Sequence, residues 1–322
     1  QLVLAQPVLA ELARRLAERP PPLVVTCARG SSDHAATYGK YVLETAVGTL
    51  VASVGPSVAA SDGRAPSGLG QALFLAVSQS GRSPDLLRLT ERARAAGALV
   101  VGLINDTASP LAARCELVIP LCAGEERAVA ATKSYLLAGF AFLQLAAAWT
   151  GDPALGDTAR GAPDALAAAA ALDWGPALAP LTSASSLYVI GRGAGLGAAL
   201  EVALKLKETC RLHAEAFSAA EVLHGPVALV GPGFPVLALG QADHTAAATR
   251  DVVERLVGLG AAVSSVHEVT GARLLPVVAG VPALLAPLCQ VQTFYLAVPG
   301  LAAARGYDAD APAHLHKVTE TV

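Results

Sequence analysis

An internal repeat is the feature of this sequence that most constrains its fold. A short β-rich run at Leu23–Cys27 is followed by a glycine turn and a helical stretch, and Leu187–Ile190 begins the same succession. The match extends to a later helix in each copy, which ends at Gly97 in one and at Gly260 in the other, an offset of 163 residues (260 − 97). Because insertions would have shifted this offset, the repeat indicates two copies of one structural unit.

Each copy has the order strand, glycine turn, helix, strand, turn, helix, which predicts parallel sheets covered by helices. We therefore predict an α/β fold of two tandem domains, each a parallel sheet flanked by helices in a flavodoxin-like, three-layer α/β/α arrangement. The predicted parts are a first domain at 1–150, a linker at 151–180 with one short helix at 163–172, a second domain at 181–305 and a C-terminal tail at 306–322. Ligands of such folds bind where strands lead into helices, here at 28–34, 78–84, 191–197 and 240–245.

Composition argues against two classes of function. The chain has a net charge of -3 and therefore no basic footprint for nucleic acid. Its longest apolar stretch, Leu136–Trp149, is shorter than the roughly 20 residues that span a membrane, so we expect a buried helix and no membrane partner. The five cysteines form no C-x-x-C pair, which favours buried free thiols in a reducing cytoplasm over disulfides or a metal site.

A serine-rich loop in the first copy predicts a phosphate site. The run Ser78-Gln79-Ser80-Gly81-Arg82-Ser83 follows a buried strand and precedes a predicted helix with Pro84 in its first turn. A helix N-terminus offers free N–H groups and a partial positive charge, and a glycine lets the backbone approach an anion closely. We therefore predict that a phosphate monoester is bound by Ser32, from the neighbouring loop, together with Ser78, Gln79, Ser80 and Ser83.

The alternative for these serines is helix capping alone. The second copy offers an internal comparison, because its equivalent loop, Gly240–His244, lacks the hydroxyls and contains an acid at Asp243. We therefore expect one phosphate per chain, held by the first domain.

A dinucleotide site is a competing interpretation of the second copy. The run Gly193-Ala194-Gly195-Leu196-Gly197-Ala198 fits the pattern G-x-G-x-x-A, but such a site also needs a second strand ending in Asp or Glu about 20 residues later. The sequence predicts helix at 211–215, and no G-x-x-x-x-G-K-[ST] motif is present. A nucleotide-dependent dehydrogenase is therefore disfavoured, and no cofactor is expected.

Ionisable residues gather in the second copy. Glu201, Lys205 and Glu208 share one helix face, in a chain of which only 15% of residues are charged. They form either a solvated face with salt bridges or a face that looks into the crevice. His224 precedes Gly225 on a predicted turn, where an imidazole suits proton transfer near neutral pH, although a lone histidine there is more often structural. Lys317 lies in a polar tail that either frays or folds over an active site.

With these motifs together, the chain resembles the sugar isomerase (SIS) domain family in its two-domain form, in particular the isomerase half of glucosamine-6-phosphate synthase and stand-alone glucosamine-6-phosphate deaminases. The resemblance rests on the motifs Ser78–Gly81, Ala130–Lys133, Leu200–Glu208 with His213–Ala216, and Leu223–Pro226. The ending Lys317–Val322 is similar to that of the deaminase group.

The resemblance implies roles for these positions. It implies that the serine-rich loop and Ser32 bind the sugar 6-phosphate, and that Glu208 moves a proton between C1 and C2. It implies that His224 helps to open the sugar ring, reaching in from the partner subunit of a homodimer, and that Lys317 contacts the open-chain carbonyl from a C-terminal lid. Glu201 and Lys205 would line the same pocket.

The sequence contains no N-terminal glutaminase domain, which favours deamination over synthesis from glutamine. The expected function is a cofactor-free aminosugar-phosphate deaminase or isomerase that converts glucosamine 6-phosphate to fructose 6-phosphate and ammonia, through ring opening and C1–C2 proton transfer. An aldose–ketose isomerase or a deglycase of another amino sugar phosphate stays open as an alternative, as does a non-catalytic phosphosugar sensor.

Overall fold

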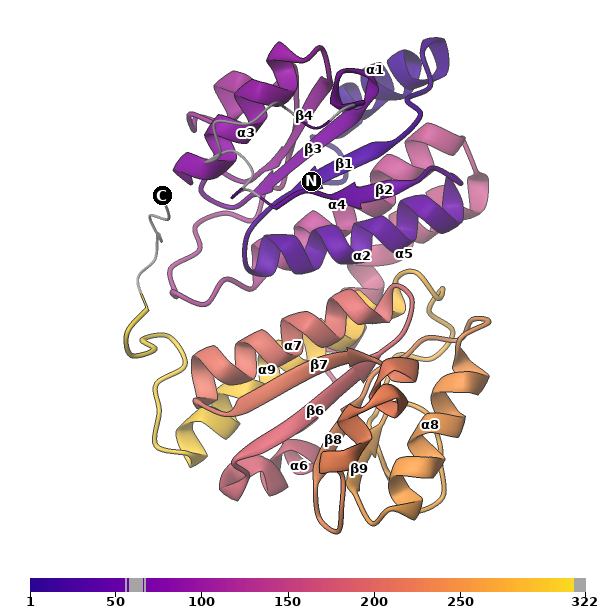
Figure 1. The fold of residues 1–322 in the computed structure, drawn as a ribbon, viewed down its shortest axis with the longest axis vertical. Coiled ribbons are helices and arrows are strands. Elements are labelled where there is room, and N and C mark those ends of the chain that lie inside the picture. The colour runs from indigo at the N-terminus through magenta and orange to yellow at the C-terminus, as the bar shows by residue number, and fades with distance from the viewer. Residues whose placement is uncertain (56, 58–65, 67, 316–322) are drawn as a thin grey trace. The chain divides into compact units, whose positions relative to one another are not determined.

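The computed structural model describes residues 1–55, 57, 66 and 68–315 of the chain, so the predicted lid residue Lys317 lies outside the described residues. The described residues form two compact units, the first within 1–126 and 131–160, and the second within 127–130 and 161–315. Each unit contains a five-stranded sheet in which neighbouring strands pair in parallel (Figure 1). The predicted pair of parallel α/β sheets is therefore confirmed.

The first sheet has the strand order β2-β1-β3-β4-β5. Its strands are β1 (Val24–Cys27), β2 (Val51–Ser53), β3 (Leu73–Ser78), β4 (Leu99–Ile104) and β5 (Leu117–Pro120). The helices of this unit are α1 (Gln6–Glu18), α2 (Ser31–Ala46), α3 (Pro84–Ala95) and α4 (Lys133–Thr150), with short 3-10 helices η2 (Leu69–Gln71) and η3 (Ala112–Arg114). The central strand β3 is buried along its whole length, as expected for a parallel strand covered on both faces.

Helices cover this sheet on both faces. On one face, Leu86 and Leu89 of α3 pack in the same apolar core as Phe74 of β3. Alternate side chains of a strand point to opposite faces, so the intervening residues of β3 face the other helices. There α2 and α4 approach closely, because a Cβ atom at Gly39 of α2 would lie 2.3 Å from the ring of Phe142 of α4.

The second sheet has the order β10-β9-β8-β6-β7. Its strands are β6 (Ser186–Gly191), β7 (His213–Ser218), β8 (Pro235–Ala238), β9 (Ala262–Ser265) and β10 (Arg273–Leu274). The helices of this half are α5 (Pro153–Ala170), α6 (Gly175–Leu178), α7 (Gly195–Cys210), α8 (Ala246–Gly258) and α9 (Ala286–Ala304), with 3-10 helices η4 (Ala179–Ser183), η5 (Ala219–His224) and η6 (Pro226–Leu229). When the strands are numbered within each sheet, both sheets have the order 2-1-3-4-5, which is the flavodoxin-like order.

Two local predictions were wrong. Residues 211–215 do not continue a helix, because Arg211 adopts a left-handed conformation (φ 48°) that ends α7, and β7 begins two residues later. The predicted linker helix at 163–172 is instead α5, which begins at Pro153, a favourable first residue for a helix. The side chain of Asp152 accepts a hydrogen bond from the N–H of Ala154 (2.8 Å) and so caps this earlier start.

The apolar stretch Leu136–Trp149 lies within α4, most of whose residues are buried. Among the residues that the structure describes, no helix combines the length and the apolar character needed to cross a lipid bilayer. All five cysteines are free, as predicted, but Cys122 is exposed and Cys115 is only partly buried, so the expectation of buried thiols holds for three of them.

Candidate active site

The serine-rich loop lies at the carboxyl end of β3 and is folded around Gly81. The N–H group of Gly81 donates to Ser78 Oγ over 2.9 Å, and Gly81 has a positive φ of 62°. The space beside it is filled, because a Cβ atom at Gly81 would lie 2.1 Å from Ser109 Oγ. Only glycine therefore fits this position without strain, because of its positive φ and its contact with Ser109.

The loop leaves hydrogen-bond donors unused. Among the described residues, the N–H groups of Ser80, Arg82 and Ser83 have no acceptor, and the Ser83 hydroxyl does not cap α3 although Ser83 is its N-cap residue. Gln79, Ser80 and Ser83 are half-buried, while Ser78 is buried. Free N–H groups and hydroxyls at the start of a helix of 12 residues are suited to binding an anion.

Ser32 lies in the first turn of α2 and is half-buried. Since α2 follows β1, and β1 pairs with β3, the loops that carry Ser32 and Ser78 leave neighbouring strands at the same edge of the sheet. An ion pair links these two connections, because the guanidinium of Arg29 donates to the carboxylate of the buried Asp85 through Nε (3.0 Å) and Nη2. This pair was not predicted from the sequence, in which its local signal is an acid in the first turn of α3.

The equivalent loop of the second unit is closed by its own carboxylate. Asp243 Oδ1 accepts hydrogen bonds from the N–H (2.7 Å) and the hydroxyl (2.5 Å) of Thr245, and Asp243 Oδ2 accepts one from Gln241 Nε2 (2.9 Å). Burial raises the pKa of Asp243, but these hydrogen bonds outweigh burial and hold the pKa below its usual value. Asp243 is therefore an anion at neutral pH, directly before α8.

The ionisable residues of α7 form a continuous chain of contacts. Lys205 Nζ lies 2.7 Å from Glu208 Oε2 and 3.2 Å from Glu201 Oε1, and the hydroxyl of Tyr295 in α9 donates to Glu201 Oε1 over 2.6 Å. Glu201 is fully buried and Lys205 is 1% exposed, so the alternative of a solvated face is wrong for both. Tyr295 was not predicted as a member of this cluster, because it lies 94 residues from Glu201 in the chain.

These contacts set the charges of the cluster. Burial lowers the pKa of Lys205, but the carboxylates of Glu201 and Glu208 outweigh burial and hold the pKa above its usual value. The ammonium ion is therefore kept between two carboxylates. The Glu208 side chain is 21% exposed, so a molecule from solution can reach Glu208, whereas Glu201 and Lys205 are buried.

His224 is the last residue of η5 and is exposed, directly before Gly225, which has a φ of 142°. Among the described residues, no hydrogen bond or ion pair joins His224 to the α7 cluster. Within the same described ranges, no group of three His, Cys, Asp or Glu side chains is arranged to hold a metal ion.

Two sheets of one strand order, each with its loops at the carboxyl edge, define a duplicated flavodoxin-like α/β protein. The chain belongs to the SIS domain family, whose model matches residues 22–148 in the first unit and 180–268 in the second. Its sequence is 35% identical over 314 residues to glutamine–fructose-6-phosphate aminotransferase (isomerizing) of Aeropyrum pernix, and 34% identical over 314 residues to the enzyme of the same name from Symbiobacterium thermophilum. These matches cover 89% and 91% of the chain but 49% and 51% of the relatives, so the chain spans about half their length.

Solved structures show the same fold. A proposed phosphosugar isomerase from Silicibacter pomeroyi is 44% identical and superposes with a TM-score of 0.89, over 95% of this chain and 93% of that one. Glucosamine-6-phosphate deaminase from Thermotoga maritima superposes with a TM-score of 0.77 over 97% of this chain and 96% of that one, at 20% identity, a likeness that concerns the fold alone.

Proposed function

We propose that the protein is a phosphosugar isomerase-type enzyme that deaminates an amino sugar 6-phosphate, with glucosamine 6-phosphate as substrate and fructose 6-phosphate and ammonia as products. The observation that carries this proposal is the buried ammonium ion of Lys205 held between Glu201 and the accessible Glu208. The membership of the SIS family and the 44% identity to a proposed phosphosugar isomerase support it.

The proposed reaction follows from the character of these groups. The serine-rich loop holds the 6-phosphate, and His224 assists ring opening to the aldehyde. Glu208 removes the proton from C2, which gives an enolamine, and returns the proton to C1. The product of this transfer is an imine at C2, and water converts it to the ketone with release of ammonia. No electron acceptor is needed, because the oxidation of C2 is balanced by the reduction of C1.

The cluster explains why Glu208 is suited to this task. A general base must be within reach of the substrate and correctly oriented, and the buried ammonium group of Lys205, 2.7 Å away, holds the Glu208 carboxylate in position. Lys205 is also held by Glu201, whose carboxylate accepts a hydrogen bond from Tyr295. A Lys–Glu ion pair in solvent would not hold the carboxylate of the base in one fixed orientation.

The test is a direct assay. The purified chain is incubated with glucosamine 6-phosphate without any added cofactor, and ammonia and fructose 6-phosphate are measured. We expect both products in equal amounts and a loss of about 10²- to 10⁴-fold in kcat for Glu208→Gln, with the binding of the sugar phosphate retained. Glu254→Gln, an exposed glutamate on α8, is the matched control and should leave the rate unchanged.

Other outcomes distinguish the alternatives. Sugar phosphate binding without products would favour a sensor, whereas interconversion of an aldose and a ketose phosphate without ammonia would favour a simple isomerase. Full activity of Glu208→Gln would contradict the assignment of the base.

The proposal includes a homodimer in which His224 acts in the active site of the partner subunit. Two inactive variants, Glu208→Gln and His224→Ala, provide the test when they are mixed and allowed to exchange subunits. Each mixed dimer then contains one site with both residues intact, so activity should return. If both residues of a site came from the same subunit, mixing would restore nothing.

A further inference from the structure

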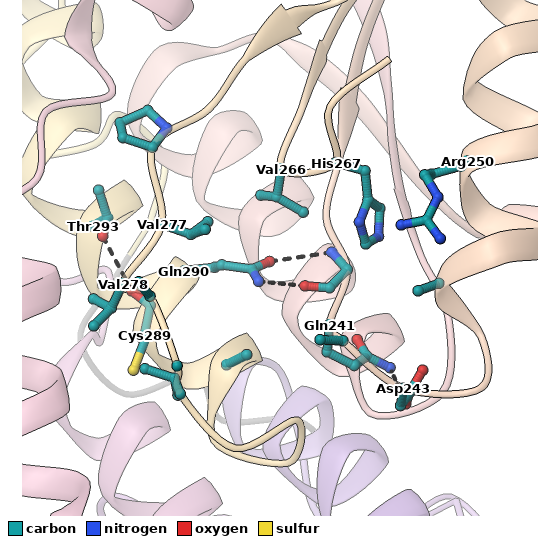
Figure 2. Close-up of a pocket in the computed structure, with 18 residues that line it drawn as sticks. Gln241, Asp243, Arg250, Val266, His267, Val277, Val278, Cys289, Gln290 and Thr293 are labelled. Atoms are coloured by element: carbon teal, nitrogen blue, oxygen red, sulfur yellow. Dashed lines mark hydrogen bonds between the residues drawn. The ribbon is translucent and has the colours of Figure 1, made fainter.

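A cavity of about 500 Å³ lies in the second unit and is separate from the residues assigned above to the proposed reaction (Figure 2). Its walls come from the loop after β8, from the first turns of α8, from the segments that follow β9 and β10, and from the first half of α9. In sheets of this strand order, ligands bind at the carboxyl ends of the strands. The volume is also typical of sites for small molecules.

One side of the cavity is apolar. It is lined by alanine and proline side chains, by Cys289 and by the valines Val266, Val277, Val278 and Val281. Burial raises the pKa of the Cys289 thiol to about 11, so this thiol is neutral at pH 7. Val277 is 42% exposed, which leaves apolar surface that a ligand would remove from water. This side therefore suits a hydrocarbon or aromatic group.

The other end of the cavity carries two opposite charges that do not pair with each other. Arg250 of α8 is exposed, and its guanidinium makes no ion pair or hydrogen bond with any residue that the structure describes. Asp243 is ionised, and within the described part of the chain its Oδ2 atom accepts only the bond from Gln241, which leaves room for one more donor. Each charge is thus available to an opposite charge on a ligand.

The remaining polar groups at this end add no charge. Burial is the main cause that lowers the pKa of His267, the nearby Arg250 adds to it, and Asp243 offsets only part of the effect. His267 is therefore neutral near pH 7, and its Nε2 atom is buried without a hydrogen-bond partner among the described residues. Figure 2 shows Arg250 and His267 at one end of the cavity and Val277, Val278 and Cys289 toward the other.

The wall between the two ends is held in place before any ligand arrives. The buried side chain of Gln290 accepts a hydrogen bond from the N–H of Gly240 (3.3 Å) and donates one back to its carbonyl oxygen (Figure 2). Gly240 itself is required there, because a Cβ atom would lie 2.3 Å from His267 Nε2. A wall fixed in this way reduces the ordering cost of binding.

We propose that this cavity binds an α-amino acid with an apolar side chain, with the carboxylate of the ligand on Arg250, its ammonium group on Asp243, and its side chain among the valines. Long side chains on a helix point back toward its N-terminus, so Arg250, in the second turn of α8, is directed toward Asp243, which precedes the helix. A singly charged ligand would leave one of the two groups unpaired, whereas a zwitterion satisfies both.

Calorimetric titration of the full chain with three probes tests the ligand class. The probes are L-phenylalanine, 3-phenylpropanoate, which lacks the ammonium group, and 2-phenylethylamine, which lacks the carboxylate. We expect L-phenylalanine to bind and each analogue to bind about 10- to 100-fold more weakly, because each loses one charge-assisted interaction. Equal affinity for 3-phenylpropanoate, or no heat with L-phenylalanine, would overturn the proposal.

Variants locate the binding site. Arg250→Gln and Asp243→Asn should each weaken L-phenylalanine binding about tenfold, and Asp243→Asn keeps the acceptor oxygen that Thr245 uses. The controls are Arg255→Gln and Asp251→Asn, exposed residues on the same helix that do not line the cavity and should leave affinity unchanged. If the control variants weaken binding equally, the site lies elsewhere. The readout is binding rather than turnover, so failure here would leave the proposed reaction unaffected.

Discussion

Replacing Lys205 by methionine tests the buried cluster most directly. Methionine keeps most of the buried stem but removes the ammonium ion, which leaves the carboxylate of Glu201 fully buried, next to the hydroxyl of Tyr295 on α9 but without the cation of Lys205. Removing one partner of a buried ion pair costs about 3–5 kcal/mol, because the remaining charge is uncompensated. We expect a loss of this size for Lys205→Met. The second change Glu201→Gln removes the uncompensated charge and should recover most of it.

Urea unfolding of chains that carry Trp149→Phe, so that the buried Trp174 of the second unit is the one fluorescent tryptophan, provides the measurement. Lys207→Met, an exposed residue of the same helix, is the control and should change stability by less than about 0.5 kcal/mol. In Lys205→Met, Glu201 can reduce the cost by taking up a proton, so the deficit against the wild type should narrow as the pH is lowered from 7 to about 5. A loss below about 1 kcal/mol, or no recovery with Glu201→Gln, would refute this account of the cluster.

Two further predictions concern the loops. Gly81→Ala should lower the free energy of unfolding by about 2–5 kcal/mol, because of the positive φ and because the new Cβ atom would lie 2.1 Å from Ser109 Oγ. Gly30→Ala, at a φ of 54° with open space beside it, should lower it by only about 1–2 kcal/mol. Thermal unfolding measures both variants, and equal losses would show that the contact with Ser109 does not matter. For His267, burial and Arg250 place the pKa in the folded state below that in the unfolded state, so the unfolded chain binds more protons and stability should fall as the pH drops below about 6.5. His267→Gln should lose less stability over that range, and an unchanged pH profile would contradict the inference.

The repeat made the fold predictable, because the succession of strand, turn and helix is local and appears twice. The serine-rich loop was predictable for the same reason, since the strand, the loop and the helix that position it are consecutive in the chain. The start of β7 was not predictable from the same signals. The residue that ends α7 in a left-handed conformation is Arg211, where a glycine would have marked the helix end.

The contacts that complete each site depend on residues far apart in the sequence. Tyr295 reaches Glu201 across 94 residues, and Arg29 reaches Asp85 across 56. No periodicity links such positions, because each pair meets only once the sheet has formed. The burial of Lys205 has the same origin, since spacing on a helix defines a face but not what covers that face.

The carboxylate of Asp243 makes the two equivalent loops of this duplicated protein different in what they can bind. An anion attached to the chain is present at a high effective concentration at all times, whereas a phosphate from solution is present only when its carrier is bound. The second loop therefore has an anion of the chain itself as a hydrogen-bond acceptor, whereas the N–H groups of Ser80, Arg82 and Ser83 in the first loop have no acceptor among the described residues. One acidic side chain thus separates a loop in which the donors of Thr245 are satisfied by the protein from a loop whose N–H donors stay available to an anion from solution.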